Sequence, residues 1–151
     1  MARKPPIFSY KKAEDSTGFL LWQVMTIWQR NLNALLKPFD LTHGQFVVMA
    51  STYWLHLHNQ TVTQIDIALH AKMDPMVVSN ILKILVQKKL IVRTHSSIDT
   101  RAKLVELTEK GISLLNSTVK EVENFDKKFF SKIGKDISFF NKSLQNIIEG
   151  K

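Results

Sequence analysis

A carboxylate and a guanidinium stand two positions apart in the one stretch of this chain that lacks a helical pattern. They belong to Asp99 and Arg101, within RTHSSIDTRAKLVELT at residues 93–108. A carboxylate at this spacing can hold a guanidinium through charge-assisted hydrogen bonds, and it can also cap a turn. Taken alone, the two residues are best interpreted as an ordinary exposed ion pair worth at most ~1 kcal/mol. The surrounding elements must decide whether they have a binding role.

The sequence provides little for other kinds of chemistry. It contains no cysteine, which excludes disulfides, thiol catalysis and Cys-ligated zinc. No nucleophile–base–acid set and no Gly-rich phosphate loop stands out, so neither enzyme activity nor a cofactor is expected. Of the five histidines, His56 and His58 are two apart and point to different sides of a helix. The other three have no carboxylate at ligand spacing, so no metal ligand is expected.

The chain is basic, with a formal net charge of +8. The charge is +4 over residues 1–12, −1 over 13–60, +3 over 61–110 and +2 over 111–151. A basic surface is the electrostatic signature of polyanion binding, but it can also serve solubility alone. The length of 151 residues favours one domain. The N-terminus has no apolar signal-peptide core, and no apolar stretch reaches the roughly 20 residues of a membrane span, so a soluble cytoplasmic protein is expected.

Hydrophobic periodicity predicts six helices and one hairpin. After an extended arm at 1–15, the apolar residues of the first helix, about 17–36, step by 4, 3, 4 and 3; they are Leu21, Met25, Trp28, Leu32 and Leu35. Three further helices are predicted from Thr42 to about His58, from Thr63 to the turn near Lys72–Asp74, and over about 74–89. Two strands, LIVRTH and AKLVEL, follow and are separated by SSIDTR. The last two helices are predicted over about 109–130 and 135–149.

Capping residues predict where the central helices begin. Thr42 and Thr63 each have Gln or Asp three residues later, which is the capping-box pattern. Asp74 before Pro75 suits the N-cap and first position of the next helix. The helices from 63 and 74 therefore meet at a tight turn and form a helix-turn-helix. This pattern alone is weak evidence of function, because many helical bundles contain such a corner.

The helix over 74–89 has two different faces. Its apolar stripe is made of Val78, Ile81, Leu82 and Leu85. Its opposite face carries Met76, Ser79, Asn80, Lys83 and Gln87. A helix-turn-helix followed at once by a hairpin is a winged helix, and this shape suits duplex DNA. The second helix is about as wide as the major groove, and an Arg at the hairpin tip can enter the minor groove, where the potential is most negative.

The run LTHGQFVVM, followed by TVTQIDIALHAKMDPMVVSNILKILVQKKLIVRTHSSIDTRAKLVELTEKG, resembles the MarR family of bacterial transcription regulators. It has the family's LTxxQ helix, helix-turn-helix, LIxR strand, DxR wing and LTxxG in order. The resemblance is strong over 41–111, whereas 17–36 and 112–149 match only in pattern. It implies a single domain, 1–151, mainly α with a small β-hairpin wing. Within it, 41–107 would be the winged helix-turn-helix, and 17–36 and 109–149 the dimerisation helices.

The resemblance also implies a function. Such proteins are homodimers that bind pseudo-palindromic double-stranded DNA operators, more often as repressors than as activators. The helix at 74–89 would enter the major groove, and Arg101, oriented by Asp99, would enter the minor groove. The candidate DNA-binding residues are Thr63, Gln64, Pro75, Met76, Ser79, Asn80, Lys83, Arg93, His95, Ser96, Ser97, Asp99, Arg101 and Lys103. Thr63 could alternatively only cap its helix, and Arg93 could instead fasten the wing to the helix. A protein-interaction module without sequence-specific DNA binding is the alternative function.

Two positions depart from the family pattern. Lys89 stands before the LIxR strand where many members have Gly, which usually supplies a left-handed helix end. Lys can make that turn only with some strain, so a different turn is the open alternative at this position. Asn80 stands where Arg is frequent, and Asn suits bidentate contact with adenine. The operator should therefore not be assumed from relatives.

Family members often bind small aromatic or phenolic effectors between the dimerisation helices and the winged helix. Here a cleft of this kind could be lined by Trp22, Met25, Trp28, Phe46, Met49 and Trp54. An aromatic and methionine stripe at helical spacing is more often part of the core. The core is the preferred interpretation of these six residues, and an effector pocket is the alternative.

Overall fold

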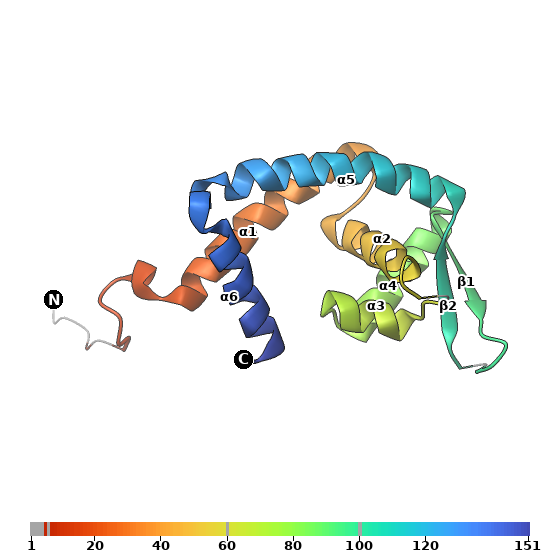
Figure 1. The fold of residues 1–151 in the computed structure, drawn as a ribbon, viewed down its shortest axis with the longest axis horizontal. Helices are drawn as coiled ribbons and strands as arrows, with labels where there is room; N and C mark the ends of the chain where they lie inside the picture. Colours follow the sequence, from red (N-terminus) through yellow and green to blue (C-terminus); the bar gives the residue numbers. More distant parts are fainter. Residues whose placement is uncertain (1–4, 6, 60, 100) are drawn as a thin grey trace.

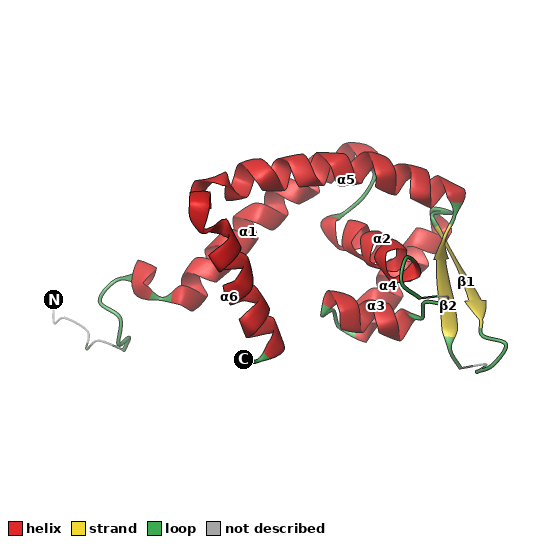
Figure 2. Cartoon of the chain, viewed as in Figure 1, coloured by secondary structure: helices red, strands yellow, loops and turns green. Residues whose placement is uncertain are grey.

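The computed structural model describes residues 5, 7–59, 61–99 and 101–151, and these form helices and one hairpin (Figures 1 and 2). The elements are α1 (Thr17–Leu36), α2 (His43–His56), α3 (Gln64–Ala71), α4 (Pro75–Gln87), β1 (Ile91–His95), β2 (Lys103–Leu107), α5 (Glu109–Phe130) and α6 (Ile137–Glu149). Figure 1 shows α2, α3, α4 and the hairpin at one end of the molecule and α1 and α6 at the other. The long helix α5 connects the two ends. The expected class, mainly α with a hairpin wing, is confirmed.

Side-chain caps start the central helices as predicted. The Thr42 hydroxyl accepts from the backbone N–H of Gln45 at 3.2 Å, and the Gln45 side chain accepts from the backbone of Thr42. Thr63 and Asp66 make the same reciprocal pair at the start of α3. In α4 the Asp74 carboxylate accepts from the backbone N–H of Met76 at 2.7 Å. Local sequence therefore fixes the first turn of each helix in the helix-turn-helix.

The hairpin is attached to the helices along one edge. β1 and β2 are antiparallel, with Ile91 opposite Leu107 and Arg93 opposite Val105. On the other side of β2, the backbone N–H of Val105 donates to the carbonyl of Val62 at 2.8 Å, and Thr63 forms a bridge with Leu104. The segment entering α3 thus lies beside β2 and is joined to it by an isolated antiparallel bridge, outside the two-stranded sheet. This contact fixes the hairpin relative to the helix-turn-helix.

Three helix ends turn through left-handed residues that are not glycine. Asp40, Lys72 and Lys89 have φ of 54°, 53° and 59°. At Lys89 the backbone N–H donates to the carbonyl of Val86, and that of Leu90 donates to the carbonyl of Leu85, both at 3.0 Å. This is the Schellman arrangement that usually contains glycine. The turn therefore does not differ from the one that glycine usually makes, although Lys89 occupies the left-handed position.

One core holds the winged helix together. It contains buried side chains from α2, α3, α4 and both strands, together with the last part of α1 and the first part of α5. Leu82 and Leu85 of α4 and Ile67 of α3 are almost fully buried. Burying such a side chain contributes about 1.5–3 kcal/mol. Therefore α4 and the hairpin rest on one shared core.

Other features refine the sequence expectations. Residues Ala13–Asp15, at the end of the arm expected to be extended, form a short 3-10 turn, and residues 1–4 and 6 lie outside the described part of the chain. α6 begins at Ile137, after a 3-10 segment in which Gly134 has φ of 63°. Within the ranges that the structure describes, none of the helices is both long and apolar enough to cross a membrane.

Candidate nucleic-acid interface

The outward face of α4 is centred on Asn80, which is exposed. Residues three, four and seven positions away share this face of the helix. They are Met76, Val77, Lys83, Ile84 and Gln87, and all are exposed. Pro75 is exposed at the first turn, and Ser79 is half-buried at the edge of this face. Val77 and Ile84 were not among the residues predicted from the sequence, although both lie outside the apolar stripe that faces the core.

The first turn of α3 is occupied by its own cap. The Thr63 hydroxyl accepts from the backbone N–H of Asp66 and donates to an Asp66 carboxylate oxygen at 2.7 Å. The structure therefore supports the capping role for Thr63. Gln64 is half-buried, and its side-chain oxygen has no hydrogen-bond partner among the described residues.

The wing turn is preorganised by short polar side chains. The Asp99 carboxylate accepts from the backbone N–H of Arg101 at 3.0 Å, which is an Asx-type turn. The Ser96 hydroxyl accepts from the backbone N–H groups of Ile98 and Asp99. In the described part of the chain no ion pair joins Asp99 to the Arg101 guanidinium, so the bond that is present goes to the backbone. Asp99 thus fixes the backbone at Arg101, and the Arg101 side chain is exposed.

The remaining wing residues differ in exposure. His95, Ser97 and Lys103 are exposed, whereas Arg93 is half-buried and lies opposite the buried Val105. One terminal nitrogen of Arg93, Nη1, is fully buried and has no partner among the described residues. The structure therefore favours the interpretation that Arg93 packs the wing against the protein.

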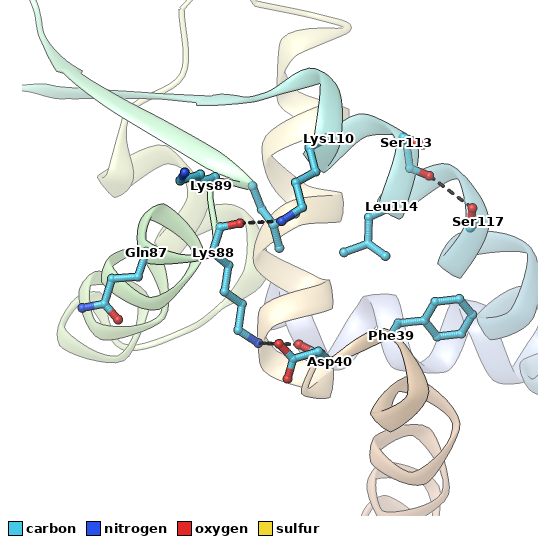
Figure 3. Close-up of a pocket in the computed structure, with 10 residues that line it drawn as sticks. Phe39, Asp40, Gln87, Lys88, Lys89, Lys110, Ser113, Leu114 and Ser117 are labelled. Atoms are coloured by element: carbon cyan, nitrogen blue, oxygen red, sulfur yellow. Dashed lines mark hydrogen bonds and ion pairs between the residues drawn. The ribbon is translucent and has the colours of Figure 1, made fainter.

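Polar contacts fix the C-terminal end of α4 (Figure 3). The Lys88 ammonium forms an ion pair with the Asp40 carboxylate at 3.1 Å and also donates to the Asp40 carbonyl. The Lys110 ammonium of α5 donates to the carbonyl of Lys88 at 3.0 Å. These residues border an open cleft of about 810 Å³ that also contains Phe39 and Leu114. Lys88 therefore ties α4 to the connection between α1 and α2, and its ammonium is directed toward Asp40.

A second cleft, of about 890 Å³, lies between α2 and α5. Phe46 and Trp54, two of the six candidate effector residues, line it together with Tyr53 and Leu115. The other four lie elsewhere: Met49 is fully buried in the core, Trp22 and Met25 are exposed on α1, and Trp28 is half-buried. The structure therefore brings together only part of the predicted set.

Trp28 belongs to a junction between α1, α2 and α5. Its indole N–H donates to the Asp126 carboxylate at 2.8 Å, and its ring meets the His43 ring edge-on at 4.9 Å between centroids. Burial lowers the pKa of His43 below its usual value, and the negative charge of Asp126 offsets part of this effect. The described residues contain no group of three or more His, Asp or Glu side chains arranged to hold a metal ion.

A helix-turn-helix with an exposed second helix, followed by a hairpin with an exposed Arg near its turn, defines the winged helix-turn-helix class. The ArnR1-like, winged-helix domain family matches residues 37–124. The uncharacterized HTH-type transcriptional regulator YdcH of Bacillus subtilis strain 168 is 37% identical over 134 residues, covering 89% of this chain and 90% of that protein. The chain therefore belongs to the ArnR1-like, winged-helix domain family and is similar over most of its length to an HTH-type transcriptional regulator.

Solved structures have the same fold. MepR of S. aureus, in complex with DNA, has a TM-score of 0.79 and 24% identity, covering 92% of this chain and 99% of that one. CouR from Rhodococcus jostii RHA1, bound to p-coumaroyl-CoA, has a TM-score of 0.79 and 25% identity, covering 91% of this chain and 95% of that one. The resemblance found in the sequence is therefore confirmed, and the fold extends beyond the winged helix into the flanking helices.

Proposed function

We propose that this protein is a cytoplasmic, homodimeric repressor that binds a pseudo-palindromic operator, with α4 in the major groove and Arg101 in the minor groove. One observation carries the proposal. The outward face of α4 and the Arg101 side chain are both exposed, while hydrogen bonds and core packing fix the elements that carry them. A helix and a wing held at a fixed relative position can contact two adjacent grooves at once.

Exposed apolar side chains on the flanking helices support the homodimer. Trp22 of α1 is 70% exposed and Phe139 of α6 is 75% exposed, and Ile147 and Ile148 are also open to solvent. In α1 only Leu32 and Leu36 are buried, and α6 has no buried residue. Large exposed apolar patches mark association sites. In the proposed domain organisation, 41–107 binds DNA, and 17–36 and 109–149 pair with a second copy.

We further propose that a small aromatic effector releases the protein from DNA. The cleft between α2 and α5 supports this part of the proposal, because it is lined by Phe46, Tyr53 and Trp54 beside apolar residues of α5. It joins α2, within the winged helix, to α5, which leads to the proposed dimerisation helices. A ligand there could change the relative position of these two parts.

The test begins with selection of genomic fragments by the purified protein, with and without phenolic ligands. For the selected operator, Arg101→Ala should weaken binding and reduce the slope of log affinity against log salt by about 1. Lys37→Ala, which removes an exposed charge between the proposed dimerisation and DNA-binding segments, is the matched control and should change neither. Unchanged operator affinity of Arg101→Ala at physiological salt would show that the wing assignment is wrong.

A further inference from the structure

The outward face of α4 is less polar than a solvent-exposed helix face should be. Met76 is 69% exposed, Val77 46% and Ile84 39%. All three lie three or four residues from Asn80 along the helix, so they surround that amide on one face. A helix at a protein surface normally places charged and polar residues there. Three of the five exposed neighbours of Asn80 are instead apolar.

The fold does not require these side chains. The core-facing stripe of α4 is already provided by Val78, Leu82 and Leu85, each fully buried. The exposed apolar residues are therefore available to a binding partner. A second copy of this chain is the less favourable partner, because the much larger apolar surface of α1 and α6 lies at the other end of the molecule (Figure 1). Lys83, on the same face of α4, favours a polyanion.

In duplex DNA the major groove presents one apolar group, the 5-methyl of thymine. The same groove presents adenine N6 and N7, which together accept and donate the two hydrogen bonds of an Asn amide. An Asn flanked by branched apolar side chains therefore matches an adenine with thymines close by. A helix rises 1.5 Å per residue, so Val77 and Ile84 are separated by about 10 Å, or roughly three base-pair steps.

We propose that α4 selects an A·T-rich half-site, in which Asn80 bonds an adenine edge and Val77 and Ile84 contact thymine methyl groups on either side. This inference rests on the proposed entry of α4 into the major groove. It makes Val77, Asn80 and Ile84 the residues that determine operator sequence. Met76, at the first turn, adds a flexible apolar contact next to them.

The experiment uses the full-length protein. Selection from a random duplex library identifies the preferred half-site, and fluorescence anisotropy then measures affinity. Each contacted thymine is replaced by deoxyuridine, which removes the methyl group and keeps every hydrogen bond. Losing one buried methyl should weaken binding about fourfold. Replacing a T·A pair by a 5-methylcytosine·G pair should retain the methyl contribution.

Three variants assign the contacts. Val77→Ala should lose its sensitivity to deoxyuridine at one position, and Ile84→Ala at another, about three base pairs away. Asn80→Ala should lose discrimination at one adenine, by about 5- to 150-fold. Lys83→Ala is the matched control on the same face and should weaken binding to all sequences alike. The deoxyuridine series on the unaltered protein tests the inference even if a variant folds poorly.

The outcomes separate the inference from the proposed function. Selection of G·C-rich half-sites, or indifference to every thymine methyl, would overturn the inference and leave the DNA-binding role of α4 intact. A uniform loss of affinity in Val77→Ala, with the deoxyuridine effect unchanged, would overturn the assignment to that residue. Absence of any preferred duplex would overturn both.

Discussion

Lys89 occupies a backbone conformation that a side chain makes costly. Its φ of 59° is left-handed, which costs an L-residue roughly 1–2 kcal/mol. The surroundings hold it there: Leu90 is buried next to it, the Thr108 hydroxyl donates to the Lys89 carbonyl at 2.8 Å, and the Lys110 ammonium donates to the Lys88 carbonyl. The chain therefore makes a turn that usually contains glycine without one, through tertiary contacts.

Relieving this strain should stabilise the protein. Because the Lys89 side chain is exposed, Lys89→Gly loses little packing, and it should raise the free energy of unfolding by about 0.5–1 kcal/mol after the entropy of glycine is counted. Urea denaturation measures the change. Lys89→Ala is the control, because it removes the same side chain and keeps the strained φ. Equal effects of both substitutions would show that the strain is unimportant.

His43 should make stability depend on pH. Burial lowers its folded-state pKa below the usual 6.5, so the unfolded chain binds the proton more tightly. The free energy of unfolding should therefore fall as pH drops below about 6.5, until the pH passes the folded pKa. Denaturation between about pH 7.5 and pH 5 measures the slope. His43→Phe keeps a ring against Trp28 and should flatten it, whereas His70→Gln, at an exposed position, should not. A steeper fall in His43→Phe would contradict this account.

At the scale of elements, helix starts were predicted best, because they depend on residues close together in the sequence. Thr42, Thr63 and Asp74 cap the helices that their neighbours in sequence indicated, because a cap requires only residues two or three positions away. The bridge between Thr63 and Leu104 could not be predicted in this way, because it joins residues distant in sequence. The inward position of Arg93 could not be predicted either, because alternation along a short strand does not show which face of the strand meets the core.

The start of α5 packs against the end of the α4 turn. Gly111 is buried, and a Cβ at this position would overlap the carbonyl oxygen of Leu90. This explains the glycine of the LTxxG motif through close approach of two backbones rather than through its own φ.

Gly111→Ala should therefore destabilise the protein by about 1–3 kcal/mol, because the added methyl forces α5 away from the carbonyl of Leu90. Thermal and urea denaturation should both detect the loss. Gly18→Ala in α1 is the matched control, since its new Cβ meets nothing within 4 Å and should be neutral or slightly stabilising. If Gly111→Ala were as stable as the parent protein, the close packing of α5 on Leu90 would be wrong.

At the scale of the whole molecule, the apolar stripe of α1 is buried at one end of the helix and exposed along the rest. The apolar series of α1 has uniform spacing, yet Leu32 is buried in the core whereas Leu21 and Met25 are exposed. Periodicity predicted the helix and its apolar face, but it could not show which part packs inside the chain. A core and a subunit interface both require the same stripe.

The exposed half of that seam should carry the dimer. Trp22→Glu places a charge on a side chain that is 70% exposed in a single chain, so the fold should survive while association fails. Two copies of the change meet in a symmetric interface. If each Trp contributes at least about 1.5 kcal/mol, the dimer dissociation constant should rise by about 100-fold or more. Sedimentation equilibrium should show a dimer for the parent protein and a monomer for the variant.

Leu69→Glu, on the exposed face of α3, is the control and should remain dimeric. A parent protein that sediments as a monomer, or a Trp22→Glu variant that stays dimeric, would show that this surface does not carry the dimer. Because operator affinity requires two half-sites bound together, the monomeric variant should also lose most of its preference for the palindrome over a single half-site.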